Sequence, residues 1–332
     1  MEARPPDRPV VCVLGDIAVD VRLSLPALPR HGEDAFASDS GTGVGGCGAN
    51  VSICLARLGI TPRIFAGVGD DLWGQEALAL LSALGADVSV VTVVPGRGTH
   101  LTVIVVTPDG ERTMLGHRAA SSHLGPDVLA DGLAPAVPAG LVVSGYALAD
   151  DPQRATALRA LDLAARDGVP VTLDLPGRLS SAMCDITRDV LPQVGLLIVA
   201  EDDVCPLGGR RDPEAALAFL ADQVADVVVT QGADGCRYLG RDGFHRASFP
   251  PVRAHDSTGA GDAFAAGLVA ARLAGLGIGE ALEVSSAFGA AATVRPGAGD
   301  ALPGPPDALT LLLDGGNTVS AAASSWLSRL CH

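Results

Sequence analysis

The sequence predicts an α/β fold: a doubly wound, mostly parallel sheet with helices on both faces. From residue 141 onward, short apolar runs of strand composition alternate regularly with helical segments. This order gives a parallel sheet with right-handed crossovers. In addition, 48% of the 332 residues are hydrophobic but only 3% are aromatic. A sizeable core is therefore available, and Ala, Val and Leu must build it.

The first part of the chain predicts a buried strand followed by irregular and helical segments. An apolar run at residues 9–14 ends in Gly15-Asp16 and is expected to be that strand. Residues 21–44, with their prolines and small residues, are expected to form short strands outside the main sheet. A strand at 62–68 precedes a helix to about residue 84, with Asp70 and Asp71 as capping residues. Residues 88–94 and 101–106 have strand composition, and an Asp-Gly turn at 109–110 predicts a hairpin.

The second part of the chain repeats strand and helix. Strands are expected at 141–144, 170–174, 196–199 and 226–230, and helices at about 152–167, 185–191 and 213–224. Two Ala-rich helices are expected from residue 262 to about 276 and from 278 to about 293. Residues 315–332 form a polar, Ala/Ser-rich tail that is open to disorder and carries no assignable function.

Composition excludes several classes of function. A formal net charge of -15 argues against nucleic-acid and anionic-membrane partners, which attract basic surfaces. The chain has no Lys, which excludes Schiff-base chemistry and a Walker A loop. Its seven Cys form no C-x-x-C pair, so neither zinc nor a disulfide framework is indicated. No apolar run is long enough to span a membrane and no signal-peptide core is present, so we expect a cytoplasmic protein.

A glycine loop at residues 256–262, Asp-Ser-Thr-Gly-Ala-Gly-Asp, runs into an apolar helix. Gly259 and Gly261 allow a tight turn and close approach of a ligand to main-chain N–H groups. These groups lie at a helix N-terminus, which binds anions such as phosphate. Asp262 is either a helix cap or a base held beside a phosphate site.

A second glycine loop, at residues 43–50, also leads into an apolar segment, from Val51 to Leu58. Its glycines would let a hydroxylated ligand approach the main chain, with Asn50 facing back from the first turn. Asp16 and Asp20 follow the first strand at an even spacing, which puts both on one face of an extended segment. The alternatives are a structural turn for the loop and two solvated acids for the aspartates.

The two loops together resemble the signatures of the PfkB (ribokinase-like) family of carbohydrate and nucleoside kinases. The second signature, D-[TS]-T-G-A-G-D-x-F, matches at every position, and the first, G-G-x-x-x-N followed by A-x-L-G, matches at 45–50 and 56–59. The resemblance covers residues 9–313 and implies a ribokinase-like fold. It also implies a small β lid with strands from about 21–44 and 95–120, and a homodimer formed through this lid.

The resemblance also implies roles for individual residues. Asp262 would be the catalytic base, with the N–H groups of Gly259, Ala260 and Gly261 stabilising the transferred phosphoryl group. The acceptor would be bound by Asp16, Asp20, Gly45, Gly46 and Asn50. ATP would be contacted by Thr230, Gly232, Gly235, Ser286 and Glu201. A monovalent cation such as K⁺ would be held near Asp256, Thr258, Arg295 and Gly297.

The sequence departs from the family in the segment that handles Mg²⁺. Many members carry N-x-x-E after the strand at 196–199, whereas here Glu201 replaces the Asn and Val204 replaces the Glu. The three adjacent carboxylates at 201–203 could still order hydrated Mg²⁺, or they could be a solvated acidic turn. Ala18 also lacks the amide that ribokinases proper place near the sugar.

The function implied is ATP-dependent phosphorylation of a primary hydroxyl on a small sugar, as in ribokinases and fructokinases. A nucleoside kinase acting on adenosine, inosine or pseudouridine remains an alternative, as does a ligand-binding member of the family without efficient chemistry. An NAD-dependent oxidoreductase is disfavoured because no G-x-G-x-x-G follows the first strand.

Overall fold

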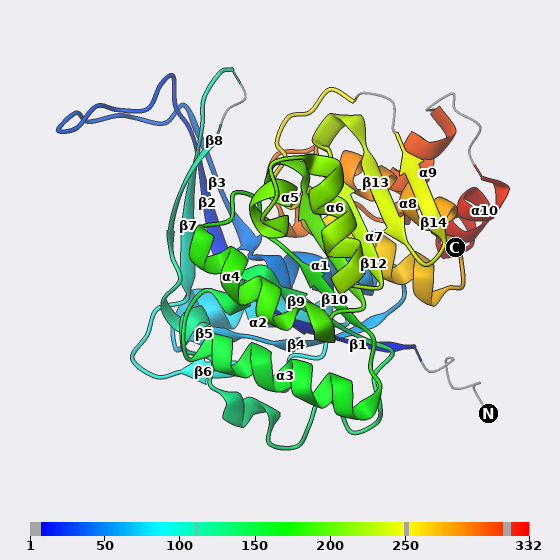
Figure 1. Ribbon diagram of the computed structural model, residues 1–332. Coiled ribbons are helices and arrows are strands. Elements are labelled where there is room, and N and C mark those ends of the chain that lie inside the picture. Colours follow the sequence, from blue (N-terminus) through cyan, green and yellow to red (C-terminus); the bar gives the residue numbers. More distant parts are fainter. Residues whose placement is uncertain (1–7, 110–111, 249–251, 315–319, 332) are drawn as a thin grey trace, which may run out of the picture.

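An eight-stranded sheet forms the centre of the computed structural model, which describes residues 8–109, 112–248, 252–314 and 320–331 (Figure 1). Its strand order is β14 (Gly243–Ala247), β13 (Cys236–Gly240), β12 (Asp226–Thr230), β11 (Leu196–Ala200), β10 (Val171–Asp174), β9 (Gly140–Ser144), β1 (Val10–Leu14) and β4 (Thr61–Phe65). The strands from β12 to β4 are parallel, β13 is antiparallel to β12, and β14 is antiparallel to β13. The predicted mostly parallel sheet is therefore confirmed.

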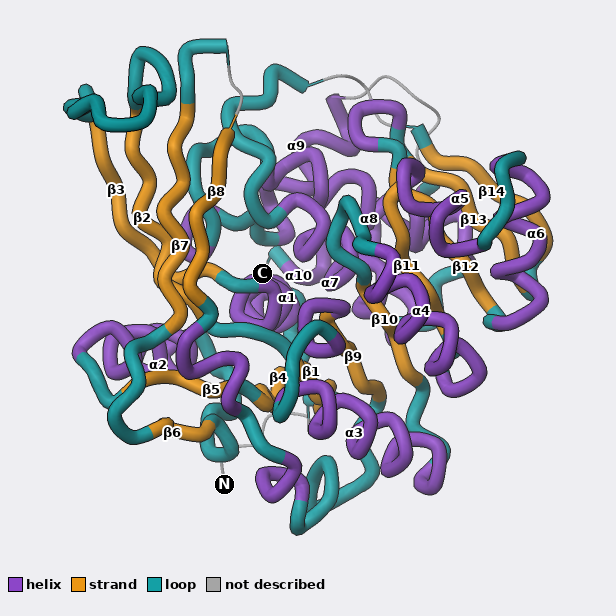
Figure 2. The backbone as a smooth tube through the Cα atoms, turned by 60° about the vertical axis from the view of Figure 1, so that its left-hand side comes forward, coloured by secondary structure: helices purple, strands orange, loops and turns teal. Residues whose placement is uncertain are grey.

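Helices cover both faces of this sheet, because alternate residues of each strand point to opposite sides. In β1, Val11 and Val13 join one buried cluster, while Cys12 and Leu14 join the other. The first cluster includes the helices α1 (Cys47–Arg57), α2 (Leu72–Ala83), α7 (Ala260–Leu273) and α8 (Ile278–Ala292). The second includes α3 (Gln153–Asp167), α4 (Ser181–Val190), α5 (Glu201–Gly208) and α6 (Pro213–Gln223). The two layers of helices are seen in Figure 2.

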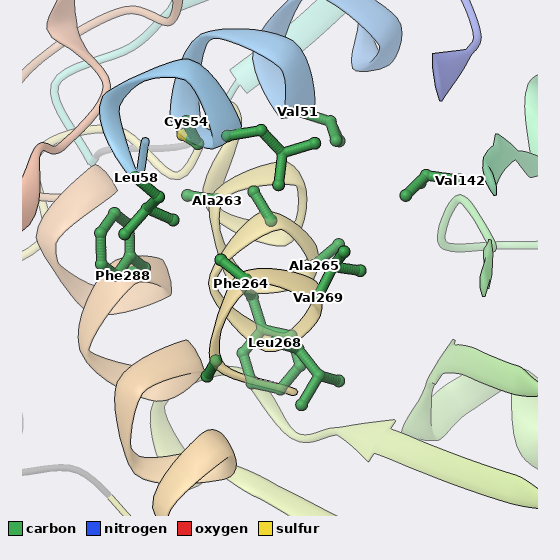
Figure 3. Close-up of a cluster of buried hydrophobic side chains, with 14 of the residues drawn as sticks. Val51, Cys54, Leu58, Val142, Ala263, Phe264, Ala265, Leu268, Val269 and Phe288 are labelled. Carbon is green, nitrogen blue, oxygen red and sulfur yellow. The ribbon is translucent and has the colours of Figure 1, made fainter. Parts of the chain in front are cut away.

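Helix α7 lies at the centre of the first cluster, between α1 and α8 (Figure 3). Its residues from Asp262 to Ala271 are all buried, and most of them are small. At Gly267 an added Cβ would stand 3.2 Å from the Cα of Ser285 in α8, so the two helices approach closely. This packing fixes the N-terminal end of α7, which carries the second glycine signature.

A separate four-stranded sheet stands beside the main one, and we call it the lid sheet. Its order is β3 (Asp39–Gly45), β2 (Ala18–Ser24), β7 (His100–Val106) and β8 (Arg112–His117) (Figure 2). The small second sheet predicted from segments 21–44 and 95–120 is thus present. The Gly110 of the predicted Asp-Gly turn lies outside the described residues.

Three further details differ from or refine the predictions. The apolar run at 62–68 divides into β4 and the short β5 (Gly67–Gly69), which pairs with β6 (Thr92–Val94), the only strand within 88–94. Helix α1 begins at Cys47, four residues earlier than expected, so Asn50 lies inside it. Asp71 caps α2 through the N–H of Gly74 at 2.9 Å, whereas Asp70 accepts a hydrogen bond from Gly96 at 3.1 Å and caps nothing.

Much of the C-terminal tail, for which disorder was one expectation, is helical. Helix α10 (Ala321–Leu330) buries Trp326 and Leu327, and it packs against α9 (Pro305–Asp314) and α8. The expectation of a polar tail is therefore wrong for these residues, because one face of the segment is apolar. Residues 315–319 lie outside the described part. Within the described part, no helix combines the length and the apolar character needed to cross a membrane.

Candidate active site

The two glycine loops meet in space, although 212 positions separate their key side chains. Each loop opens a helix, and the N-termini of α1 and α7 lie together. The Nδ2 of Asn50 donates a hydrogen bond of 2.7 Å to Oδ2 of Asp262. Asn50 therefore faces back toward the loops as predicted, and it positions the carboxylate of Asp262 rather than leaving it as a simple helix cap.

Two opposing effects act on the carboxyl group of Asp262. Burial raises its pKa above the usual range, while the hydrogen bond from Asn50 and the thiol of Cys47 oppose the rise. The pKa of Cys47 is itself raised, mainly by burial and then by Asp262, Asp174 and Asp16. Its thiol thus stays protonated and can donate to Asp262. The result is a buried carboxylate with a net raised pKa, which suits a general base.

The loop before α7 presents main-chain N–H groups to the solvent side. Gly259 has a φ of 76°, a left-handed conformation that favours glycine, and α7 has no side-chain cap. The N–H of Ala260 donates to the carbonyl of Ser257 at 3.3 Å and so belongs to a turn. Within the described residues, the N–H groups of Gly259 and Gly261 have no such partner and remain available to an anion.

Asp256 ties this loop to the segment after α8. Its Oδ1 accepts from the N–H and hydroxyl of Thr258 at 2.9 and 2.6 Å, and its Oδ2 accepts from the N–H of Gly297 at 2.8 Å. From the lid sheet, Arg112 reaches the hydroxyl of Ser257 and lies 3.8 Å from Asp256. The side chain of Arg295, in contrast, points to Asp307 at 2.7 Å and is not part of this group.

On the acceptor side, Asp20 of β2 covers Gly45. An added Cβ at Gly45 would stand 2.1 Å from Oδ2 of Asp20, so glycine is required for the carboxylate to lie there. Burial raises the pKa of Asp20 to about 6, His100 opposes the rise, and Asp262 and Asp256 add to it. Asp20 therefore lies within electrostatic reach of both ends of the second signature.

Asp16 also faces this site but is held by a network of its own. Its carboxylate accepts from Arg118 through two bonds of 3.1 Å and from Gln153 at 2.9 Å, and His100 Nδ1 lies 3.5 Å away. Burial acts to raise the pKa of Asp16, but the contacts with His100, Arg118 and Gln153 outweigh it and lower that pKa to about 2. Asp16 is thus ionised at neutral pH and paired with Arg118. Both aspartates neighbour His100, in agreement with the prediction that they share one side.

Several residues at the site were not identified from the sequence. They are Cys47, His100, Arg112, Arg118, Tyr146, Gln153 and Asp174. Asp174 ends β10, and its pKa is raised well above the usual range by burial and by Asp262. Tyr146 follows β9 and is 44% exposed. Its pKa is raised mainly by burial and then by the nearby Cys47, Asp262 and Asp16. The position of Asp174 at the carboxyl end of a predicted parallel strand was the available signal.

A cavity of about 330 Å³ lies on the other side of the glycine loop at 257–261. Of the predicted nucleotide contacts, Thr230, Gly232, Gly235 and Ser286 all line it, together with Ala260, Gly261 and Phe264. Its wall is mostly small and apolar, which suits the flat ring of a nucleobase. A larger cavity of about 460 Å³ extends between the lid sheet, α2 and the segment 296–301, and its lining includes Asp20, Trp73 and Asp256.

The acidic segment at 201–203 is helical, with Glu201 and Asp202 exposed and Asp203 buried. It is the first turn of α5. Glu201 accepts from Gln231 at 2.7 Å and Arg237 at 3.1 Å, and Asp203 accepts from the N–H groups of Arg178 and Leu179, both at 2.8 Å. Glu201 does not line the 330 Å³ cavity. No group of three His, Cys, Asp or Glu side chains that could hold a metal occurs in the described ranges.

Comparison with known proteins agrees with this geometry. The family model described as pfkB family carbohydrate kinase matches residues 9–305. Fructokinase of Klebsiella pneumoniae is 32% identical over 312 residues, covering 88% of this chain and 96% of its own. Among solved structures, Arabidopsis thaliana ribokinase with ribose and ATP aligns with a TM-score of 0.74 at 22% identity, covering 92% and 98% of the two chains.

A further solved structure is the aminoimidazole riboside kinase of Salmonella enterica, in complex with aminoimidazole riboside and an ATP analogue. It aligns with a TM-score of 0.71 at 25% identity, covering 91% of this chain and 99% of its own. The family model covers most of the chain, and both glycine signatures meet in the structure. The chain belongs to the pfkB family of carbohydrate kinases.

Proposed function

We propose that this protein transfers the terminal phosphoryl group of ATP to a primary hydroxyl of a small sugar. One observation carries the proposal. The buried carboxylate of Asp262, held by Asn50, stands between the acceptor-side residues and a nucleotide-sized cavity bordered by its own loop. A base in this place can reach a hydroxyl group that faces the phosphate.

In the proposed reaction, Asp262 accepts the proton of the acceptor hydroxyl as its oxygen attacks the terminal phosphorus. The bond from this phosphorus to the bridging oxygen breaks, and ADP leaves. The N–H groups of Gly259 and Gly261, at the positive end of α7, stabilise the charge on the phosphoryl group. Asp20, Gly45 and Gly46 orient the acceptor, while Asn50 positions the base.

ATP is proposed as the donor because the 330 Å³ cavity adjoins the glycine loop and the solved riboside kinase holds an ATP analogue. Mg²⁺ bound with the nucleotide would neutralise phosphate charge, with waters filling most of its coordination sphere. The described residues supply no dedicated cage for it. Asp256 already accepts three hydrogen bonds, and the monovalent cation expected beside it stays a prediction.

A small sugar is favoured over a nucleoside by the composition of the lid sheet. Its four strands carry no Phe, Tyr or Trp that could stack on a base. The alternative, a nucleoside kinase, is favoured by Tyr146, whose half-exposed ring lies near Asp262 and Asp16, and by the riboside kinase relative.

Seven free thiols and the use of ATP fit a cytoplasmic enzyme, which is part of the proposal.

We also propose a homodimer formed through the lid sheet. By strand alternation, Leu101, Val103 and Leu115 point away from the face that carries Asp20 and His100. Leu101 and Leu115 are 37% and 62% exposed, an apolar surface that a second copy of the chain would cover.

The experiment that tests the reaction is ADP release by the Asp262→Asn variant. Loss of the base is expected to lower kcat by about 100- to 10,000-fold, with nucleotide binding by calorimetry unchanged. Asp222→Asn, the same chemical change on the exposed face of α6, is the matched control and should keep full turnover. Acceptor-dependent ADP release by Asp262→Asn at the normal rate would refute the assignment. If the unaltered protein binds ATP but releases no ADP with any acceptor, the non-catalytic alternative is favoured.

A further inference from the structure

We propose that Gly299 and Arg57 are positioning residues for Asp262, the base of the proposed reaction, on which they act through other groups. Gly299 orients the side chain of Asn50, and Arg57 holds the segment 297–302, which contains Gly299. The inference rests on the proposed function, since it concerns the base of that same reaction. It goes further by assigning roles to two residues that lie outside the reacting groups.

The side-chain amide of Asn50 is held at both of its ends. Its Nδ2 donates to Oδ2 of Asp262 at 2.7 Å, and its Oδ1 accepts from the N–H of Gly299 at 3.4 Å. An amide carries an acceptor at one end and donors at the other, so only one orientation satisfies both neighbours. In the reversed orientation, Oδ1 would face a carboxylate and Nδ2 would face another donor, which is costly in a buried site. The N–H of Gly299 therefore favours the orientation in which Asn50 donates to the base.

The close approach of the backbone at position 299 requires glycine. Gly299 has a φ of 60°, in the left-handed region that favours this residue. An added Cβ would stand 2.3 Å from the carbonyl oxygen of Val44 in the lid strand β3, so the backbone would have to shift away from β3. At 3.4 Å the hydrogen bond to Asn50 is already long, and such a shift is expected to break it.

The segment 297–302 also contacts the glycine loop that precedes α7. The N–H of Gly297 donates to Oδ2 of Asp256 at 2.8 Å, at the start of the loop. Leu302 is buried, and its Cδ2 lies 2.8 Å from the place that a Cβ on Gly259 would occupy. The segment therefore supports the loop along its length, and its position bears on the groups that the loop carries.

Arg57, the last residue of α1, holds this segment against the helix that carries Asn50. Its guanidinium donates to the carbonyl of Leu302 and, at 3.3 Å, to the carbonyl of Asp300. Asn50 lies about two helical turns before Arg57, so the two side chains leave the same face of α1. The segment thus runs along one face of α1 and is bound to it at both ends.

Loss of either positioning residue should act on proton transfer. When the amide of Asn50 is no longer held from the side of Gly299, it spends less time as a donor to Asp262. That hydrogen bond stabilises the ionised carboxylate, so weakening it raises the pKa of Asp262 further. A smaller fraction of the base is then ionised at a given acidic pH, and phosphoryl transfer slows.

The first experiment measures kcat of Arg57→Met against pH, with Mg-ATP and whichever of D-fructose, ribose and inosine the unaltered enzyme uses best. Methionine replaces the apolar stem of Arg57 and removes its donors. The acidic limb should move up by about 0.5 to 1 pH unit, so that kcat on that limb falls about 3- to 10-fold, the net value of one hydrogen bond. Arg188→Met is the matched control, since Arg188 of α4 also donates to two main-chain carbonyls, at 2.8 and 2.7 Å. It should leave the limb in place.

The variant Gly299→Ala tests the other positioning residue. The acidic limb should move as far as it does in Asn50→Ala, because both changes remove the donor from the base. Gly168→Ala is the control: Gly168 is also left-handed, with a φ of 68°, and an added Cβ there meets nothing within 4 Å. An unmoved limb in Gly299→Ala would show that Gly299 does not orient Asn50.

Double variants show whether the effects pass through Asn50. In an Asn50→Ala background, neither Arg57→Met nor Gly299→Ala should move the limb further, since the amide that they orient is gone. Shifts that add to that of Asn50→Ala would overturn the inference. Should Gly299→Ala not fold, the pair of Arg57→Met and Asn50→Ala decides, because it spans the whole chain of contacts.

The outcomes separate this inference from the proposed function. A lower kcat with an unmoved limb in Arg57→Met would mean that Arg57 only stabilises the fold, because a loss of folded enzyme lowers kcat without shifting the titration of the base. That result would overturn the inference and leave the kinase proposal intact. If the unaltered protein releases no ADP with any of the acceptors, the proposed function fails, and the inference fails with it.

Discussion

At Asp262, the hydrogen bond from Asn50 opposes the effect of burial on the pKa. The bond stabilises the ionised carboxylate, so its removal should raise the pKa further. In Asn50→Ala, the acidic limb of the pH dependence of kcat should therefore move to higher pH, and kcat at neutral pH should fall about 10-fold or more. Ser52→Ala on the same helix, whose hydroxyl donates to the carbonyl of Gly48, is the control. A lower kcat with an unmoved limb would mean that Asn50 acts in some other way.

The ionised carboxylate of Asp20 is expected to favour binding of the acceptor and, at the same time, to destabilise the folded protein. Burial raises the pKa of this carboxyl group to about 6, so the folded state holds its proton more tightly than the unfolded state does. Above pH 6 the ionised group costs stability, and the cost disappears as pH falls toward 4. Asp20→Asn should raise the free energy of unfolding by up to about 3 kcal/mol at pH 7.5. It should also weaken acceptor binding.

The measurement for Asp20→Asn is urea unfolding at several pH values between 4 and 7.5. The gain over the unaltered protein should shrink steadily toward pH 4, because Asp20 is then protonated in the folded state. A gain that is constant with pH would point to a packing effect instead of the charge of Asp20.

At the scale of elements, a side chain of β8 joins the lid sheet to the glycine loop at 256–262. Arg112 contacts Ser257 and neighbours Asp256, which places a positive charge at the loop that would hold the triphosphate. Arg112→Gln should raise KM for ATP and lower kcat, with a combined loss of about 10- to 100-fold in kcat/KM. Arg166→Gln, on the exposed surface of α3, is the control. A change in acceptor KM alone would argue against contact with the phosphates.

Some of the strands and helices could be predicted from a single sequence, and others could not. Parallel strands and their helices were predictable because each strand is a continuous apolar run and each turn has a clear breaker. The helix α5 was missed because Glu201, Asp202 and Asp203 look like a polar turn, and only the burial of Asp203 and Val204 shows otherwise. The antiparallel pair β13 and β14 and the helices α9 and α10 were missed. In α10, Ala and Ser make up most of the segment and obscure its apolar face.

For the candidate site, the sequence predicted the residues that lie in glycine loops, since those loops have a recognisable spacing. It could not identify Arg118, Gln153 or Tyr146, because each reaches the site from an element whose local sequence carries no chemical pattern. Asp16 illustrates the limit: its place beside the acceptor was predicted, but its pairing with Arg118 depends on a contact across 102 positions.

At the scale of the whole molecule, the exposed apolar face of the lid sheet predicts the oligomeric state. Leu115→Glu should convert the proposed dimer into a monomer, because a buried charge in an apolar interface is costly. Light scattering after gel filtration would give the mass directly. Leu313→Glu, at a position 64% exposed on α9, is the matched control and should leave the mass unchanged. A monomeric mass for the unaltered protein would refute the dimer.

The hydrogen bond between Asn50 and Asp262 also has a consequence for biosynthesis. Because 212 positions separate the two residues, a ribosome that adds 5–20 residues per second needs about 10 to 40 s to supply the second partner. Throughout that interval the newly made α1 lacks α7, the helix it is built to pack against. The first half of the active site must therefore survive as an exposed apolar surface, a natural binding target for chaperones, until the last third of the chain arrives.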